Sequence, residues 1–529
     1  MLSRLPVLFG WILFVAAIAW PTVALLVQSL VDGRLPIGGL TYSSRQFGLL
    51  GRSVLLSGAG AIGCVALSLP AAMAFVHLRG GKVTTLFVGL MATLVLCPPM
   101  VYTFAWQRAL PAATPAWIQC LITWMLWAWP LPAMLIAAGW RRSAHSCYEA
   151  ALLDTGPLGA WLHVVLPILL PFAALGGLVL FILFLGDYGV PHAAGLIVYS
   201  TELLGWATTS RFVLDTAWPA LPVVAVTGLS VVGAIRLWRA RWPTSSPASR
   251  TMLPVPSHAS RWAEVCLWLL IGVALLVPIG RLLIDLTGLS ELREALQTYT
   301  VELLWSVGCA ILGGILVVAI SVCLSASPHG RPLAVFWSLM FGAVPGALVG
   351  TALVAAYGHS AWGSVYDYPP IVVLSYVARF LWMGMLAAML VRSQTARDVL
   401  DLARLDGVPT WTVWTRLIVP LHRGTLLAVA GMVAVQSLSE IAATTLVRVP
   451  TFAPIAHVLI EAFHRFEDGL LIALSLCLFA VAVPDPEPVP THSARQIATF
   501  RGDFRYNARG TAVWAGEYHR QSRVGQESS

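Results

Sequence analysis

The chain has 529 residues, of which 58% are hydrophobic and only 11% are charged. Soluble globular domains carry about 25% charged residues, so this composition excludes an ordinary soluble protein and indicates residence in a lipid bilayer. The formal net charge is +8, and in a membrane protein we expect such a basic excess to orient loops rather than to bind nucleic acid.

Twelve apolar runs are long enough to be transmembrane helices, which need about 20 residues each. The first run lacks a small-residue cleavage site, so we interpret it as a retained span rather than a removed signal peptide. In chain order the runs are 7–30, 52–76, 85–107, 117–139, 166–186, 217–238, 263–288, 302–325, 333–357, 371–391, 421–445 and 467–483. We therefore predict an all-α integral membrane protein with about 12 transmembrane helices.

The lysine and arginine residues predict the orientation of these spans. If the N-terminus is cytoplasmic and the spans alternate, most basic residues outside the spans fall on the cytoplasmic side. This distribution agrees with the positive-inside rule. We therefore expect both chain termini in the cytoplasm.

The sequence contains an internal repeat. Three pairs of corresponding residues are each separated by 253 positions: Ser53 and Ser306, Pro167 and Pro420, and Asp187 and Glu440. A constant offset predicts two fused six-span units, and the even number of spans makes them parallel. The basic segment 239–262, rich in Pro and Ser, is predicted to be a cytoplasmic linker, and the polar tail 484–529 is predicted to be disordered.

Each unit carries a polar segment between two of its spans. The first reads EAALLDTGPLGAWLHVVLP (149–167) and the second reads DLARLDGVPTWTVWTRLIVP (401–420). In the second segment a helix beginning at Asp401 is broken at Gly407, and a second helix is predicted over 410–418. Such a helix–glycine–helix elbow makes a rigid knob that can enter a groove on a soluble partner.

The two polar segments resemble the EAA loop of ABC importer permeases, in which E-A-A is followed by three residues, a glycine and a hydrophobic-Leu-Pro ending. The second segment has the spacing of that loop, with Asp in place of Glu and Leu402 in place of Ala. The first segment has Thr155 where glycine is expected, and Gly156 follows it. The resemblance assigns the docking of an ATPase to the matching residues Glu149, Ala150, Ala151, Gly156, Pro167, Asp401, Ala403, Gly407 and Pro420.

Two fused copies of this kind resemble the iron(III)-transport permease family, whose relatives carry thiamine and other small solutes. The similar segments are LGDYGVP (185–191), YSTEL (199–203), YVARFLW (376–382) and SLSEIAATTL (437–446). The resemblance covers roughly residues 50–483. It implies two MetI-like permease domains, at 52–238 and 302–483, each preceded by a transmembrane helix with an outer loop, at 1–51 and 263–301. The linker (239–262) lies between the two halves, and the tail (484–529) follows the second.

This resemblance implies a permease subunit in the inner (plasma) membrane. A periplasmic binding protein would deliver the solute, ferric iron in the first instance, and two copies of a separate ATPase subunit would grip the knobs and hydrolyse ATP. The chain itself has no GxxxxGK[ST] motif, so we expect no catalytic residues, no bound cofactor, and no nucleic acid partner. Membrane lipid is the remaining expected partner.

Several polar residues have two interpretations. Glu149 and Asp401 either contact the ATPase or are solvated acids that favour a helix start. Asp187 and Glu440 either line the transport pathway or are helix-end acids at the membrane interface. Arg379, about eight residues inside its predicted span, either pairs or faces a cavity, or it extends its guanidinium to the interface.

No metal site is predicted. The eight cysteines form no CxxC pair, which argues against disulfides and structural zinc. Six of the twelve histidines are dispersed along the chain and are interpreted as loop or interface residues: His77, His145, His163, His192, His329 and His464.

Three rival functions remain open. The same machinery would serve for thiamine or another small organic solute. An intramembrane enzyme would use Asp187 and Glu440 as a carboxylate pair, which requires the two groups to share a proton. An ion-coupled secondary transporter would need no ATPase, but it would leave the two EAA-like segments without a role.

Overall fold

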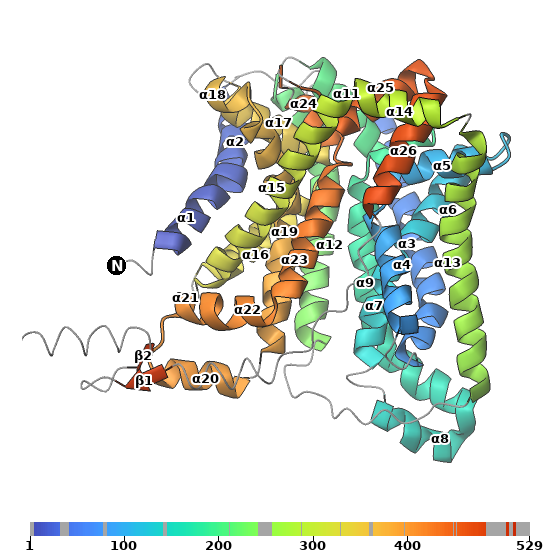
Figure 1. Ribbon diagram of the computed structural model, residues 1–529, viewed down its shortest axis with the longest axis vertical. Helices are drawn as coiled ribbons and strands as arrows, with labels where there is room; N and C mark the ends of the chain where they lie inside the picture. Colours follow the sequence, from blue (N-terminus) through green and yellow to red (C-terminus); the bar gives the residue numbers. More distant parts are fainter. Residues whose placement is uncertain are drawn as a thin grey trace, which may run out of the picture.

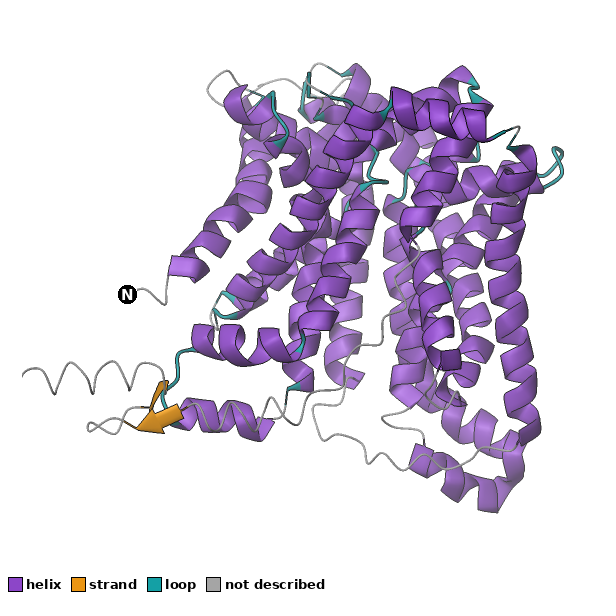
Figure 2. Ribbon diagram, in the orientation of Figure 1, coloured by secondary structure: helices purple, strands orange, loops and turns teal. Residues whose placement is uncertain are grey.

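The computed structural model describes most of the chain, and the described part is almost entirely helical (Figures 1 and 2). The described residues are 5–31, 42–77, 82–140, 145–210, 212–241, 257–286, 288–327, 330–358, 363–395, 397–447, 449–450, 452–482, 504–506 and 512–514. Most of the predicted linker and of the predicted disordered tail lies outside these residues. Within the tail, β1 (Phe504–Tyr506) and β2 (Ala512–Trp514) pair antiparallel.

The N-terminal half of the chain, residues 5–241, is a series of helices that includes two π-helical segments, Val15–Ala19 and Trp161–Val165. The α-helices are α1 (Leu5–Phe14), α2 (Trp20–Val31), α3 (Ser44–His77), α4 (Lys82–Leu96), α5 (Pro99–Ala109), α6 (Ala116–Ala128), α7 (Pro130–Gly139), α8 (His145–Ala160), α9 (Leu166–Gly186), α10 (Gly189–Ala193), α11 (Tyr199–Thr209) and α12 (Leu214–Arg241).

The C-terminal half, residues 257–482, has a similar series with one π-helical segment, Trp414–Ile418. Its α-helices are α13 (Ser257–Asp285), α14 (Leu289–Thr298), α15 (Thr300–Ser325), α16 (Arg331–Ala343), α17 (Gly346–Tyr357), α18 (Gly363–Tyr366), α19 (Pro370–Gln394), α20 (Arg397–Leu405), α21 (Thr410–Val413), α22 (Val419–Leu421), α23 (Arg423–Ser437), α24 (Ala442–Leu446), α25 (Ile455–Arg465) and α26 (Asp468–Ala482).

Among the described residues, seven helices are long and apolar enough to cross a membrane, and the number rises to 11 if each of four bent helix pairs is one span. The seven helices and three of the bent pairs coincide with predicted spans. The fourth pair, Thr410–Leu421 with Arg423–Ser437, overlaps the predicted span 421–445 mainly through its second helix. The last predicted span, 467–483, is matched only by a shorter apolar helix, Asp468–Ala480. Large apolar side chains on the long helices are exposed, as contact with lipid requires, for example Leu55, Leu229 and Ile284. The chain is therefore an almost entirely helical, multi-pass membrane protein.

Three predicted spans are not continuous helices. Over the predicted span 117–139, α6 and α7 meet at an angle of 44°. Instead of a span over 85–107, α4 and α5 meet at an angle of 94°, and instead of a span over 333–357, α16 and α17 meet at 113°. Proline lacks the N–H that would continue the first helix, and it forces the preceding residue out of the helical conformation. Val344, before Pro345, is accordingly extended, with ψ at 155°.

The predicted span 421–445 also differs from the structure. Its helix, α23, ends at Ser437, and a separate short helix, α24, begins at Ala442. Between the two lies a turn around Glu440, whose backbone N–H donates to the carbonyl oxygen of Ser437 at 3.2 Å. Glu440 therefore lies in a turn between two helices and not within a span.

The first helical segment of each half packs against the other half. The N-terminal α1 and α2 pack against α15 and α17, whereas α13 packs against α3 and α5. The contacts correspond on the two sides: the hydroxyl of Tyr357 donates to the carbonyl of Ala16 (2.8 Å), and that of Tyr102 donates to the carbonyl of Ala274 (2.7 Å). The two halves are consequently interlocked.

Helices that run across the bundle lie at both of its ends. In the view of Figure 1, α8 and α20 lie at the bottom, where they run across the bundle, and α11, α14, α24 and α25 lie at the top. The two polar segments singled out in the sequence are therefore at the same end of the molecule.

Candidate functional site

The second polar segment forms the predicted elbow. The backbone of Gly407 has φ of +67°, which an L-residue with a side chain rarely adopts. The N–H of Val408 donates to the carbonyl oxygen of Ala403 at 2.9 Å, which is the six-to-one hydrogen bond of a Schellman helix end. Gly407 thus ends α20 and turns the chain into α21.

The knob is fixed to the membrane helices through its apolar face. Ala403 is buried together with Trp414 in a cluster that includes Val322 of α15 and Val391 of α19. Asp401 is exposed on the opposite face. The knob is therefore packed against α15 and α19 on one face and exposed on the other.

The first polar segment forms a comparable elbow one residue later than expected. The sequence pattern places glycine at position 155, but Thr155 stays helical and donates its hydroxyl to the carbonyl of Ala151 at 2.9 Å. Gly156 takes the positive φ instead, at +72°. A β-carbon at Gly156 would meet nothing within 4 Å, so its conformation, and not a lack of space, explains the glycine.

Both elbows continue into a π-helical turn. Trp161–Val165 and Trp414–Ile418 are separated by the same 253 positions as the prolines that follow them. In each, the residue just before the proline donates its N–H five residues back, Leu166 to Trp161 and Val419 to Trp414. Proline cannot donate the next helical hydrogen bond, which favours such a widened turn.

At the opposite end, the acids Asp187 and Glu440 each hold a turn after a long helix. The Asp187 carboxylate accepts hydrogen bonds from the indole N–H of Trp124 (2.8 Å) and from the backbone N–H of Gly189 (2.9 Å). Glu440 accepts the backbone N–H of Ala443 at 3.1 Å and an ion pair described below. Both side chains are largely buried helix-end groups with defined structural partners.

Arg379 has the partners that its position inside a span requires. Its Nε lies 3.2 Å from Oε2 of Glu440, and Nη1 donates to the carbonyl oxygens of Gly342 (2.7 Å) and Val344 (2.6 Å). The two side chains of the ion pair are 13% and 10% exposed. Arg379 is therefore paired with a carboxylate and two backbone carbonyls, as the first of its two interpretations expects.

In the N-terminal half, two indole rings occupy the place of this guanidinium. Trp124 binds Asp187, and Trp127 donates its indole N–H to the carbonyl of Cys97 (3.0 Å), which lies at the break between α4 and α5. Side chains from corresponding helices therefore bind the carbonyl oxygens at both breaks. The neutral indoles come from α6 in the N-terminal half, and the charged guanidinium comes from α19 in the C-terminal half.

Two serines make the same hydrogen bond in the two halves. The hydroxyl oxygen of Ser53 accepts the backbone N–H of Tyr199, the first residue of α11, at 2.8 Å. The hydroxyl oxygen of Ser306 accepts the backbone N–H of Ile455, the first residue of α25, also at 2.8 Å. The serines identified by their offset in the sequence therefore position corresponding helices.

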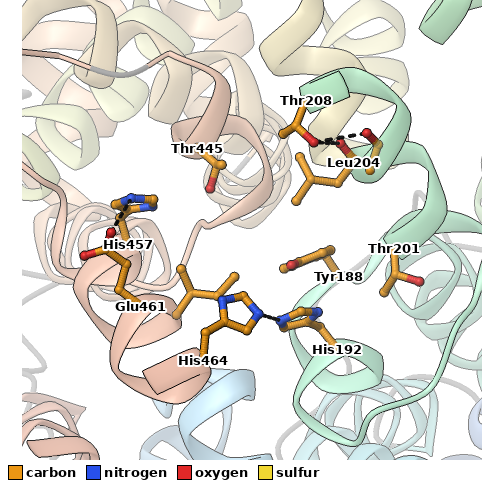
Figure 3. Close-up of a pocket in the computed structure, with 11 residues that line it drawn as sticks. Tyr188, His192, Thr201, Leu204, Thr208, Thr445, His457, Glu461 and His464 are labelled. Carbon is orange, nitrogen blue, oxygen red and sulfur yellow. Dashed lines mark hydrogen bonds and ion pairs between the residues drawn. The ribbon is translucent and has the colours of Figure 1, made fainter. Parts of the chain in front are cut away.

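A pocket of about 460 Å³ opens between the halves at this same end (Figure 3). One wall comes from α10 and α11 and the other from α24 and α25, so residues far apart in the sequence meet there. Nε2 of His192 lies 3.1 Å from Nε2 of His464. On the second wall, His457 Nε2 lies 3.9 Å from Oε1 of Glu461.

The ring of His192 is held firmly. Tyr188 stacks on it with ring centroids 4.7 Å apart and an interplanar angle of 17°. Burial, together with the electrostatic effect of the neighbouring His464, lowers the pKa of His192 to about 4. His192 is therefore neutral at neutral pH, and it was missed as a site residue because 272 positions separate it from its partner.

The part of the chain that the structure describes contains no group of three or more His, Cys, Asp and Glu side chains placed to hold a metal ion. Asp187 and Glu440 lie outside the pocket lining, and each is bound by donors from its own half. No family model, no curated protein and no solved structure matches the chain.

Proposed function

We propose that the chain is the membrane permease of an ATP-driven, binding-protein-dependent importer. The observation that carries the proposal is the pair of elbows: each has a positive-φ glycine and a π-helical turn before a proline, and both lie at the same end of the bundle. Two equivalent knobs on one face suit a partner that is itself present in two copies. ATP binding and hydrolysis belong to that partner.

The repeated contacts support two parallel six-helix halves. The π-helical turns, the serine hydrogen bonds to α11 and α25, and the capped helix breaks recur at nearly constant offsets. Parallel halves place both knobs in the cytoplasm when both termini are cytoplasmic, as the basic residues predict. The membrane would then be the inner (plasma) membrane.

The exposed surfaces of the knobs fit insertion into a groove. Leu153 of α8 is 89% exposed and Leu405 of α20 is 83% exposed, and each lies four residues after the acid that begins the motif, Glu149 or Asp401. An exposed leucine beside an acid is suited to a groove with an apolar floor and a basic rim. Two copies of the ATPase subunit are the proposed partners.

The knobs are connected to the opposite end by continuous helices. The π-helical turn Trp161–Val165 leads directly into α9, which ends beside Asp187. In the other half, the knob shares a buried cluster with α15 and α19, and α19 carries Arg379. A push on the knobs by ATP-driven closure would therefore reach the turns at Asp187 and Glu440, which we place beside the solute pathway.

Ferric iron is the proposed solute, delivered by a periplasmic binding protein. The basis is the resemblance of the segments around Asp187, Arg379 and Glu440 to iron(III)-transport permeases. Thiamine, or another small organic solute, is the alternative for the same machinery. Isolating the cognate binding protein and measuring its bound metal and organic content separates the two solutes.

The decisive experiment tests the knobs. The chain is reconstituted in liposomes with a candidate ABC ATPase and the loaded binding protein, and solute uptake and ATPase retention are measured. The double variant L153D/L405D should lose solute uptake and ATPase retention, because each leucine that would enter an apolar groove is replaced by a charged carboxylate. A matched control, L296D, changes a partly exposed leucine on α14 at the other end of the bundle and should retain both. Solute accumulation by the chain alone, without an ATPase, would refute the proposal.

A further inference from the structure

The contact between His192 and His464 joins the two halves at the pocket. His192 is supplied by α10 and His464 by the last turn of α25, and their Nε2 atoms face each other at 3.1 Å (Figure 3). The rings are nearly perpendicular, at 84°. Two imidazole nitrogens this close can share a proton or, after a small shift, bind one metal ion.

The separation of the two nitrogens is close to that of two ligands of one ion. Zinc–nitrogen bonds of about 2.0–2.1 Å at a tetrahedral angle place two ligand nitrogens about 3.4 Å apart. The observed separation of 3.1 Å therefore needs a shift of only a few tenths of an ångström, roughly the tolerance expected of a metal site. Tyr188 stacks on His192 and restricts the motion of its ring, so little further ordering of that ring is needed when an ion binds.

The pocket also offers a carboxylate as a further ligand. Glu461 lies one helical turn before His464 on α25 and lines the same pocket. Its side chain is 51% exposed, so its carboxylate is able to change rotamer toward the histidines. The described residues hold no preformed three-ligand group, and water from the open pocket completes the coordination.

We propose that His192 and His464 form a binding site for a divalent transition-metal ion of the zinc class, which bridges the two halves of the chain at the pocket. Imidazole is a preferred ligand of Zn²⁺, Ni²⁺ and Cu²⁺, whereas Mg²⁺ and Ca²⁺ prefer oxygen ligands and are excluded. Because the ligands come from α10 and α25, the bound ion opposes separation of these helices. The site does not depend on which solute the chain carries.

The test is a zinc titration of the full-length chain, free of any histidine tag, in lipid nanodiscs. Competition with a chromophoric chelator gives the stoichiometry and affinity. One equivalent should bind, and H192A and H464A should each weaken binding at least about tenfold, which corresponds to about 1.4 kcal/mol. The control H163A removes an exposed histidine next to the first knob and should leave the affinity unchanged. Unchanged affinity in H192A/H464A would overturn the site.

Bridging is tested separately by thermal unfolding. Zinc at saturating concentration should raise the unfolding temperature of the unaltered chain, because the ion binds only where both halves are in place. The increase should vanish in H192A/H464A and persist in H163A. If the unaltered chain binds one equivalent of zinc without any rise in unfolding temperature, the ion does not join the halves and the proposal fails. Mg²⁺ at the same concentration serves as the control ion.

Discussion

One guanidinium caps the second helix break, whereas two indole rings cap the first. Arg379 reaches Glu440 and two carbonyl oxygens at once, which satisfies most of its donors in a largely buried setting. Trp124 and Trp127 provide the corresponding hydrogen bonds from α6 without any charge. Removal of the guanidinium would leave the Glu440 carboxylate without its cation. Removal of the Trp124 indole would take one neutral donor from the Asp187 carboxylate, which still accepts the N–H of Gly189, and removal of the Trp127 indole would leave only the carbonyl of Cys97 without that donor.

We expect R379M to be strongly destabilising. Removing one partner of a buried ion pair costs about 3–5 kcal/mol, because the other charge remains buried without compensation. Adding E440Q to R379M should recover part of that loss, since the amide carries no charge. The measurement is thermal unfolding of the purified protein in nanodiscs.

The control for this prediction is R45M. Arg45 pairs with Glu202 at 2.9 Å, but its side chain is 69% exposed, and exposed pairs contribute about 0–1 kcal/mol. R45M should therefore change the unfolding temperature little. Equal losses in R45M and R379M would mean that the buried ion pair adds no more to stability than the exposed one.

At the level of the elements, sequence patterns located the helices but not their breaks or their neighbours. Apolar runs predicted where α3, α9, α15 and α19 lie, because lipid contact imposes a length and a composition on each span. The prolines at the two breaks were visible in the sequence, but membrane helices tolerate prolines in packed bundles. Whether a proline bends or breaks a helix depends on the packing around it, here on Arg379 and Trp127.

The candidate sites were predictable to different degrees. The elbows were recognised because their glycines and prolines recur within each segment, although the first glycine was expected at position 155. The depth of Arg379 in its span predicted that it needs a partner. The sequence did not predict that Glu440 is that partner. The His192–His464 contact carries no signal of this kind, because the two residues do not correspond under the repeat.

We expect G407A to loosen the second knob. A positive φ costs an L-residue about 1–2 kcal/mol, and no atom lies within 4 Å of a β-carbon at Gly407, so the cost comes from the backbone alone. Hydrogen exchange of the α20 amides should become faster, and binding of the proposed ATPase partner should weaken. G156A should have the same effect on α8.

The matched control is G431A in α23. Gly431 also has nothing within 4 Å of a β-carbon, but its φ is not positive. Alanine is favoured over glycine in a helix by about 0.5–1 kcal/mol, so G431A should keep or improve stability. A similar increase in exchange for G407A and G431A would show that the elbow conformation is unimportant.

For the whole molecule, the exchange of helices makes the two halves one unit. α1 and α2 lie against the C-terminal half and α13 lies against the N-terminal half, so each half is incomplete without a helix from the other. Gly10 approaches Cys323 so closely that a β-carbon there would overlap it. Small residues permit such close approach of helices in membranes, where packing contacts rather than the hydrophobic effect drive association. The side chain of Gln436 adds a buried hydrogen bond between the halves, to the carbonyl of Val95 at 2.6 Å.

We expect the halves to stay together after the chain is cut between them. A protease site inserted between residues 242 and 256 separates α12 from α13 without touching either helix. After cleavage in mild detergent, a tag on one fragment should recover both in equal amounts, because the exchanged helices α1, α2 and α13 and the Gln436 contact hold them together. Deleting residues 1–31 before cleavage should reduce recovery several-fold, since α1 and α2 are then lost from the C-terminal half. If the unaltered fragments separate on cleavage, the packing of α1 on α15 and of α13 on α3 is not what joins the halves.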